Sequence, residues 1–183
     1  MVDQMSDEKL MELLAQGNKN AAGLLYDRYH PKVFGYFVRM TRDFEASRDL
    51  TQNVFLKVIK YSHTWKEDKV FVFWLFRIAR NILVDFHRGA KRFYSFDEEP
   101  EITMIYNEQS IRNNDAHESY ELLFDAMAKL PPGYRELIEM NRFQGFSYKE
   151  IAVTTDSTEN AVKVKTFRAI QKLREIYNRI LID

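Results

Sequence analysis

The distribution of glycine and proline is the feature of this sequence that most constrains its fold. Neither residue occurs from residue 36 to residue 88. The ten that do occur lie outside that stretch, at Gly17, Gly23, Pro31, Gly35, Gly89, Pro100, Pro131, Pro132, Gly133 and Gly145. Because glycine and proline interrupt helices more often than other residues, a long stretch without them favours long helices. The sequence therefore predicts an all-α protein.

Capping signals predict three helices near the start of the chain. Ser6 should cap a first helix, since two acidic residues follow it, and this helix should end at Gly17. A second helix is predicted over 19–30. Pro31 should begin a third, because proline is favoured at the first position of a helix.

A helix predicted over 70–88 carries two kinds of side chain. It follows a predicted helix over 44–61 and a polar loop over 62–69. Apolar residues at helical spacing should form one buried face, made of Phe71, Trp74, Leu75, Ile78, Ile82 and Phe86. The other side carries Arg77, Arg80, Asn81 and Arg88. This second face suits the phosphates and base edges of a nucleic acid, and an ordinary solvated surface is the alternative.

Charge is segregated along a chain whose formal net charge is zero. Residues 32–92 contain 13 basic and 6 acidic residues, whereas residues 93–121 contain 1 basic and 8 acidic residues. The segments 1–31 and 122–183 have net charges of −2 and +2. Two nucleic-acid-facing domains around a connector that avoids or imitates nucleic acid would have this pattern, although solvated surface also explains it.

The connector separates two predicted helical domains. Periodicity fades after about residue 92, and the acidic stretch "FDEEPE" follows, which is typical of a linker. We therefore predict a domain over 1–92, a flexible acidic linker over 93–117 and a second domain over 118–183.

Residues 147–172 have the pattern of a helix-turn-helix. Ser147 and Glu150 form a capping box at the start of the first helix. "TTDS" makes the turn, in which Asp156 tolerates the left-handed conformation, and Ser157 or Thr158 should cap the second helix. That helix carries Lys163, Lys165, Arg168 and Lys172. It suits the DNA major groove, and a plain helical hairpin with solvated lysines is the alternative.

Several classes of protein are excluded by composition. The chain has no cysteine, and its four histidines lack metal-ligand spacing, so we expect no cofactor. No apolar run approaches the roughly 20 residues that span a bilayer, and the N-terminal stretch is too acidic for a secretory signal. We therefore expect a cytoplasmic protein without membrane insertion.

Two long motifs carry a resemblance to a known family. "DLTQNVFLKVIKY" and "FWLFRIARNILVDFHRGAKR" resemble, in order and spacing, regions 2.2 to 2.4 of the extracytoplasmic-function (ECF) sigma factors of bacterial RNA polymerase. The segment "LPPGYRELIEMNRFQGFSYKEIAVTTDSTENAVKVKTFRAIQKLRE" resembles region 4. The resemblance implies a non-enzymatic transcription initiation factor that binds core RNA polymerase, recognises the −35 and −10 promoter elements and promotes DNA melting. It also implies an anti-sigma factor as a partner.

The resemblance assigns roles to residues of this sequence. Contact with the melted non-template strand of the −10 element is implied for Trp65, Arg77, Arg80, Asn81 and Arg88, with burial of Trp65 as the alternative. Contact with the duplex −35 element is implied for Lys163, Lys165, Phe167, Arg168 and Lys172. Contact with the core polymerase clamp is implied for Asp49, Gln52, Asn53, Phe55 and Leu56, with plain helix surface as the alternative. The acidic stretch 97–108 would lead toward the polymerase active-site cleft.

One departure from the family and two other classes of protein bear on this reading. Thr154, Thr155 and Ser157 stand where the family usually has apolar residues, so weaker packing within the helix-turn-helix is expected. A helix-turn-helix repressor or activator would share the C-terminal domain, but it would have no use for the helix over 70–88. A nucleic-acid enzyme would need a carboxylate cluster, a phosphate-binding glycine loop or a cysteine nucleophile, and the sequence offers none of these.

Overall fold

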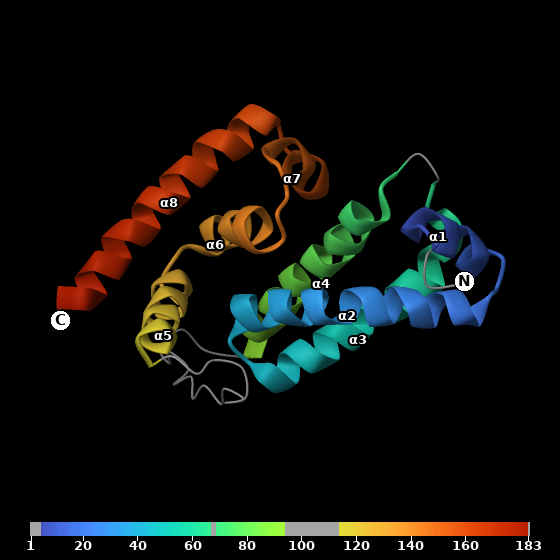
Figure 1. Ribbon diagram of the computed structural model, residues 1–183, viewed down its shortest axis with the longest axis horizontal. Helices are drawn as coiled ribbons and strands as arrows, with labels where there is room; N and C mark the ends of the chain where they lie inside the picture. Colours follow the sequence, from blue (N-terminus) through green and yellow to red (C-terminus); the bar gives the residue numbers. More distant parts are fainter. Residues whose placement is uncertain (1–4, 67–68, 94–113, 183) are drawn as a thin grey trace. The chain divides into compact units, whose positions relative to one another are not determined.

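The computed structural model describes residues 5–66, 69–93 and 114–182, and over these residues it consists of helices joined by short turns (Figure 1). The chain divides into two compact units, Met1–Glu101 and Ile102–Asp183. The predicted all-α fold with two helical parts is thus confirmed. Within the described residues, no helix combines the length and the apolar character needed to cross a membrane.

The first unit is a helical bundle with a short 3-10 turn. Its elements are α1 (Asp7–Ala15), α2 (Lys19–Thr41), α3 (Phe44–Tyr61), η2 (Ser62–Thr64) and α4 (Phe71–Phe93). Helix α2 packs against α1 and α3, and α3 packs against α4. The fully buried side chains include Leu25, Val33, Phe37, Val54, Leu75 and Phe76.

The predicted boundaries of α1 are confirmed, and local chemistry explains them. The Ser6 hydroxyl accepts a hydrogen bond from the backbone N–H of Lys9 at 3.2 Å, which satisfies one donor of the first turn. After the helix ends, Gly17 adopts a φ of +91°, a conformation that side chains rarely allow.

The prediction that Pro31 begins a new helix is wrong. Helix α2 continues through it, with Tyr29 and Val33 buried on either side. Proline removes one backbone hydrogen bond, to the carbonyl of Asp27. Asp27 and Pro31 are both exposed, so water can bind that carbonyl while the apolar face keeps packing on α3.

The buried face of α4 differs in part from the predicted one. Phe71, Leu75 and Ile82 are buried as predicted, whereas the predicted core residues Trp74, Ile78 and Phe86 are only half-buried. Three residues outside the predicted face are buried in their place: Phe76, Ala79 and Leu83. Helix α4 contacts three helices, α1, α2 and α3. Its buried face is therefore rotated about the helix axis relative to the predicted face, which assumed a single packing partner.

The second unit is organised around a long C-terminal helix. Its elements are α5 (Asn114–Ala128), α6 (Pro132–Ile138), a π-helical turn η3 (Glu139–Phe143), α7 (Tyr148–Thr155) and α8 (Glu159–Ile182). Helix α8 packs against α5, α6 and α7. A core cluster contains Met127, Leu130, Ile138 and Ala169.

The predicted linker falls mostly on residues 94–113, which lie outside the described residues. Helix α5 begins at Asn114, a few residues before the predicted start of the second domain at 118. The domain bounds 1–92 and 118–183 therefore stay predictions.

Candidate nucleic-acid interface

The helix-turn-helix is built by local hydrogen bonds at the start of α7 and α8. The N–H of Ser147 donates to Glu150 Oε2 at 2.7 Å, and the N–H of Glu150 donates to Ser147 Oγ at 3.3 Å. The predicted capping box is therefore confirmed. Between the two possible caps of α8, the structure selects Thr158, whose hydroxyl accepts from the N–H of Ala161 at 3.2 Å.

The turn between α7 and α8 has the predicted left-handed residue. Asp156 has φ 56° and ψ 49°, and its N–H donates to the carbonyl of Ala152. Aspartate tolerates this conformation better than most side chains. The turn can therefore form without the glycine that is common at such positions.

The polar residues near the end of α7 are accommodated within that helix. Thr154 is buried, and its hydroxyl donates to the carbonyl of Glu150 at 2.9 Å. Thr155 donates in the same way to the carbonyl of Ile151 at 2.8 Å, and Ser157 is exposed. Because buried hydroxyls cost free energy only when they lack a partner, the Thr154 side chain carries little of that penalty.

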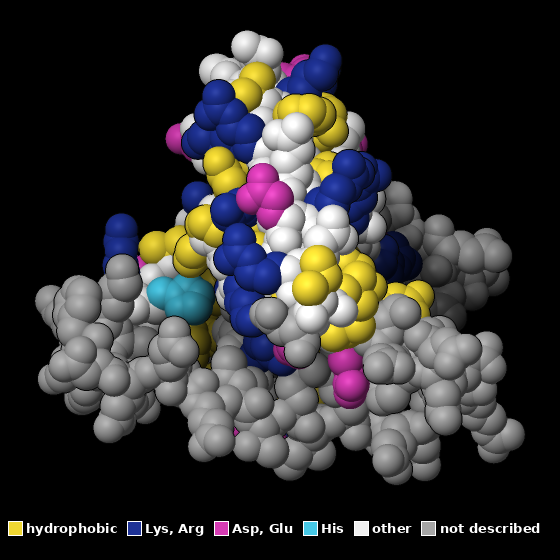
Figure 2. Space-filling model, turned by 90° about the vertical axis from the view of Figure 1, so that its left-hand side faces the viewer, with side chains coloured by type: hydrophobic (Ala, Val, Ile, Leu, Met, Phe, Trp, Pro, Cys, Tyr) yellow, Lys and Arg dark blue, Asp and Glu magenta, His cyan; other side chains and the backbone are white. Residues whose placement is uncertain are grey.

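Helix α8 presents exposed basic residues around its buried core positions. Val162, Thr166 and Ala169 are buried at helical spacing. All five residues predicted to contact the −35 element are exposed: Lys163, Lys165, Phe167, Arg168 and Lys172. Figure 2 faces this helix and shows dark blue Lys and Arg side chains along it, with apolar side chains beside them.

The exposed residues of α8 form two stripes. Lys165, Arg168 and Lys172 follow one another at spacings of three and four, and Lys163 and Phe167 are four residues apart. The Phe167 side chain is 62% exposed, so its apolar ring does not serve the core. A stripe of cations beside an exposed aromatic ring suits phosphates and base edges in one groove.

On α4 the predicted residues lie at the surface to different degrees. Asn81 and Arg88 are exposed, whereas Arg77 and Arg80 are half-buried. Arg77, Asn81 and Arg88 are four and seven residues apart, so they share one side of the helix. The exposed Asp85 lies on the same side, and sequence reasoning did not take this acidic residue into account.

The prediction that Trp65 offers an open stacking surface is wrong, and the burial alternative holds. Its side chain is only 8% exposed. The turn folds back on α3, because the Trp65 N–H donates to the Ser62 carbonyl at 3.2 Å and the Ser62 hydroxyl donates to the Ile59 carbonyl at 3.0 Å. The free energy gained by burying this large aromatic ring keeps it in the core, although its neighbours in the turn are polar.

The predicted polymerase face of α3 is exposed at four of its five positions. Asp49, Gln52 and Asn53 are exposed, and the Leu56 side chain is 64% exposed. Phe55 is buried, with its ring edge-to-face against that of Tyr26 at a centroid distance of 4.8 Å. The prediction for Phe55 is wrong because helical geometry turns this position toward the buried side of α3, where Thr51, Val54 and Val58 also lie.

Sequence reasoning missed a groove between α3 and α4 beside this face. Its walls combine apolar and charged side chains, from Leu50, Asn53, Leu56, Lys57, Lys60, Ile82, Asp85 and Phe86. Lys57 and Lys60 lie four residues beyond Asn53 and Leu56, and this spacing is the signal that could have identified them.

Family models match most of the chain. The model of sigma-70 region 2 matches residues 25–93, and the model of sigma-70 region 4 matches residues 120–173. The first match contains α3 and α4, and the second contains the helix-turn-helix.

Relatives and solved structures agree with these matches. The ECF RNA polymerase sigma factor SigM of Bacillus subtilis is 30% identical over 161 residues, which is 87% of this chain and 96% of SigM. The ECF RNA polymerase sigma-E factor of Escherichia coli K12 is 28% identical over 92% of this chain and 93% of that protein. In fold, the chain is similar to CnrH in complex with the cytosolic domain of CnrY, at 22% identity and a TM-score of 0.73, over 94% of this chain and 97% of CnrH. The chain therefore belongs to the ECF sigma factors of the sigma-70 family.

Proposed function

We propose that this protein binds core RNA polymerase through α3, reads the −35 element through α8 and the −10 element through α4, and promotes melting of the promoter. Membership of the family makes the protein a promoter-recognising transcription initiation factor that works with RNA polymerase. The residue-level proposal rests on the exposed basic surface of α8. This helix follows α7, which begins at a capping box, and the left-handed turn at Asp156.

The −35 element is read as duplex DNA. Lys165, Arg168 and Lys172 form a stripe long enough to contact both a groove and its flanking phosphates, and Lys163 with Phe167 extends the contact. The Phe167 ring would provide an apolar contact for a thymine methyl group. A capped α7 holds α8 in place for this contact.

The −10 element is bound by α4 once its bases unstack. Asn81 offers an amide that can hydrogen-bond a base edge, and Arg77, Arg80 and Arg88 offer charge to the backbone of the separated strand. Trp65 would serve this surface from the core by holding the turn that precedes α4.

The clamp of core RNA polymerase binds the exposed face of α3. Asp49, Gln52, Asn53 and Leu56 are three or four residues apart and share one side of the helix. The exposed Leu56 side chain gives this polar face an apolar centre, which is the usual anatomy of an interface.

Three further properties belong to the proposal. The protein acts in the cytoplasm, where it meets the polymerase, and it catalyses no reaction of its own, since sigma factors are non-enzymatic. An anti-sigma factor holds it inactive. This chain is similar in fold to the sigma factor RpoE, at 21% identity and a TM-score of 0.67. RpoE forms a complex with the anti-sigma factor NepR from Bartonella quintana.

Runoff transcription tests the proposal. The full-length protein and bacterial core RNA polymerase are incubated with a library of promoter-containing genomic fragments from the source organism. We expect discrete transcripts that require both proteins and that start downstream of a shared pair of sequence elements. Specific binding to duplex DNA without core polymerase, and no transcript with it, would favour a repressor or activator.

A further inference from the structure

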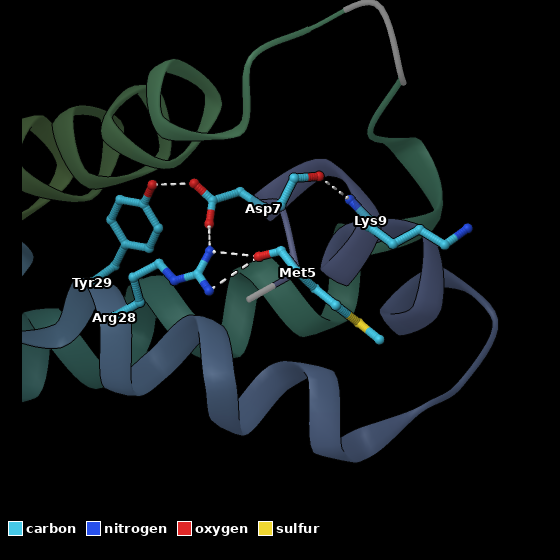
Figure 3. A network of polar contacts seen from close by, with 6 residues as sticks. Met5, Asp7, Lys9, Arg28 and Tyr29 are labelled. Atoms are coloured by element: carbon cyan, nitrogen blue, oxygen red, sulfur yellow. Dashed lines mark hydrogen bonds and ion pairs between the residues drawn. The ribbon is translucent and has the colours of Figure 1, made fainter. Parts of the chain in front are cut away.

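A polar network joins α1 to α2 at the start of the chain (Figure 3). The Asp7 carboxylate accepts hydrogen bonds from Arg28 Nη1 and from the Tyr29 hydroxyl. Both Nη atoms of Arg28 also donate to the Met5 carbonyl, each at 3.1 Å. One acidic side chain therefore binds two donors from α2 at once, and we call Asp7, Arg28 and Tyr29 the α1 clasp.

The hydrogen bonds in the α1 clasp are strengthened by charge and by partial burial. The Asp7–Arg28 pair is partly shielded, with side-chain exposures of 20% for Asp7 and 33% for Arg28. Hydrogen bonds between charged groups are stronger than those between neutral ones. Burial raises the pKa of the Tyr29 hydroxyl well above its usual range, and the hydrogen bond to Asp7 raises it further, so this group remains a donor.

The clasp is connected to the part of the first unit that precedes α4. The Tyr29 ring packs edge-to-face against the Phe71 ring at a centroid distance of 5.3 Å, and Phe71 is the fully buried first residue of α4. Helix α1 also contacts η2, which leads into the buried Trp65. Thus α1 and Tyr29 support the chain on both sides of the turn between α3 and α4.

The turn is closed by the hydrogen bonds of the Trp65 backbone N–H and the Ser62 hydroxyl, but one polar group in it is unsatisfied. The Trp65 indole N–H is buried and finds no hydrogen-bond acceptor among the described residues. An unpaired buried donor reduces the stability of the arrangement that buries it. Contacts from outside the turn, such as those of α1, therefore matter more for its position.

We propose that Asp7 is a positioning residue for promoter opening: by clasping α2 it holds α1 against η2 and holds Tyr29 against Phe71, and so keeps the Trp65 turn and the start of α4 in the arrangement that opens DNA. This inference rests on the proposed function of α4. It assigns Asp7 and Tyr29 an indirect role, without DNA contact.

The bundle has enough other contacts to survive loss of the clasp. Helix α1 keeps three buried apolar side chains, Leu10, Met11 and Leu14, and α2, α3 and α4 share a core of their own. We therefore expect Asp7→Asn and Tyr29→Phe to remain folded. Tyr29→Phe is the more conservative change, because it keeps the ring beside Phe71 and removes only the hydroxyl.

A matched control lies on the same helix. Lys9 Nζ and Glu12 Oε2 form an ion pair at 2.5 Å within α1, with 57% and 28% of their side chains exposed. Glu12→Gln removes this pair but leaves the clasp unchanged. It should behave as the wild type in every measurement below.

The first measurement reports on the free protein. In a Trp74→Phe background, Trp65 is the only tryptophan, because the chain has two. We expect Asp7→Asn and Tyr29→Phe to shift the Trp65 emission to longer wavelength and to increase its quenching by acrylamide, with unchanged far-UV circular dichroism. Emission and quenching equal to those of the Glu12→Gln control would overturn the inference.

The second measurement reports on promoter opening with core RNA polymerase. Permanganate reactivity of −10 thymines on a duplex promoter should fall severalfold for both clasp variants, while core binding stays at the wild-type level. A promoter already mismatched at −10 should restore most of the reactivity, because its −10 bases are unpaired from the start and less free energy is needed to open the DNA.

The possible failures are distinguishable. If the wild type itself opens no promoter with core polymerase, the proposed function is wrong and the role of the clasp in opening is overturned with it. If the wild type opens the promoter and both clasp variants match it, only the inference about Asp7 is wrong. Equal losses of core binding and of opening on both templates would show a general structural defect and would also overturn it. Should Asp7→Asn unfold, Tyr29→Phe decides alone.

Discussion

Trp65 illustrates how a single side chain can reverse an expectation drawn from its neighbours. It stands among polar residues, yet its ring is buried, while Trp74 in a strongly apolar helix is only half-buried. The Trp65 indole N–H lacks an acceptor among the described residues, which costs about 1–3 kcal/mol. Burial of the ring contributes at least as much in the opposite direction, so the buried position prevails.

We predict that Trp65→Ala lowers the free energy of unfolding by about 3–5 kcal/mol, because it leaves a cavity in place of a buried ring. Trp65→Phe should cost clearly less, since it keeps an aromatic ring and removes the unpaired N–H. Urea unfolding followed by circular dichroism measures both. A Trp65→Ala variant as stable as the wild type would mean that the ring does not support the core.

A second prediction compares two positions of α4. Phe76 is fully buried and Trp74 is half-buried. Phe76→Ala should therefore lower the free energy of unfolding by about 3–5 kcal/mol, and Trp74→Ala should lower it by less. The same urea titration distinguishes them. The reverse order would restore Trp74 as the main core residue of this helix.

Among the helices, α8 combines structural and binding roles in different residues. Its buried residues pack against α5, α6 and α7, and its exposed residues carry the basic stripe. This division of a helix into a packed side and a solvent side lets the exposed residues be changed with little loss of fold.

We predict that Lys165→Ala or Arg168→Ala weakens binding to duplex −35 DNA. The loss of binding free energy should be roughly 1–3 kcal/mol if the side chain reads a base edge. If the side chain contacts a phosphate, the dependence of the logarithm of the binding constant on the logarithm of salt concentration should become less steep by about one. Binding of labelled duplex −35 DNA to the holoenzyme, assembled from this protein and core polymerase, is measured by fluorescence anisotropy at several salt concentrations. Arg179→Ala, which removes an exposed charge near the end of the same helix, is the matched control. Equal effects at Arg179 and Arg168 would indicate non-specific attraction instead.

At the scale of the whole molecule, two compact units carry the proposed activities separately. The faces proposed for core polymerase and for −10 DNA are in the first unit, and the face proposed for −35 DNA is in the second. Variants in one unit should therefore leave the activity of the other unit intact.

Neighbouring residues of α3 provide a sharp test of the polymerase face. Leu56 is exposed and Phe55 is buried. Leu56→Ala should weaken core polymerase binding in a pull-down assay without changing thermal stability or −35 recognition. Phe55→Ala should instead lower the free energy of unfolding of the first unit by about 3–5 kcal/mol. Unaltered core binding by Leu56→Ala, by Asp49→Ala and by Gln52→Ala would place the polymerase contact elsewhere.

Features that depend on neighbouring residues in the chain were predictable from the sequence. The Ser6 cap, the Ser147–Glu150 capping box and the left-handed turn at Asp156 were all confirmed. Each is formed by a side chain and the backbone within a few residues, so the local sequence contains all the groups involved. The exposed basic residues of α8 were also predictable, because charged side chains seldom leave water.

Features that depend on packing between helices were decided only by the tertiary structure. The sequence determined that helices form, that one would carry a basic face and that a capped turn would precede it. Packing decided that α2 runs through Pro31, that Phe76 replaces Trp74 in the core, and that Phe55 and Trp65 are buried. Helical periodicity defines which residues share a face, but the number and direction of the neighbouring helices determine how much of that face is covered.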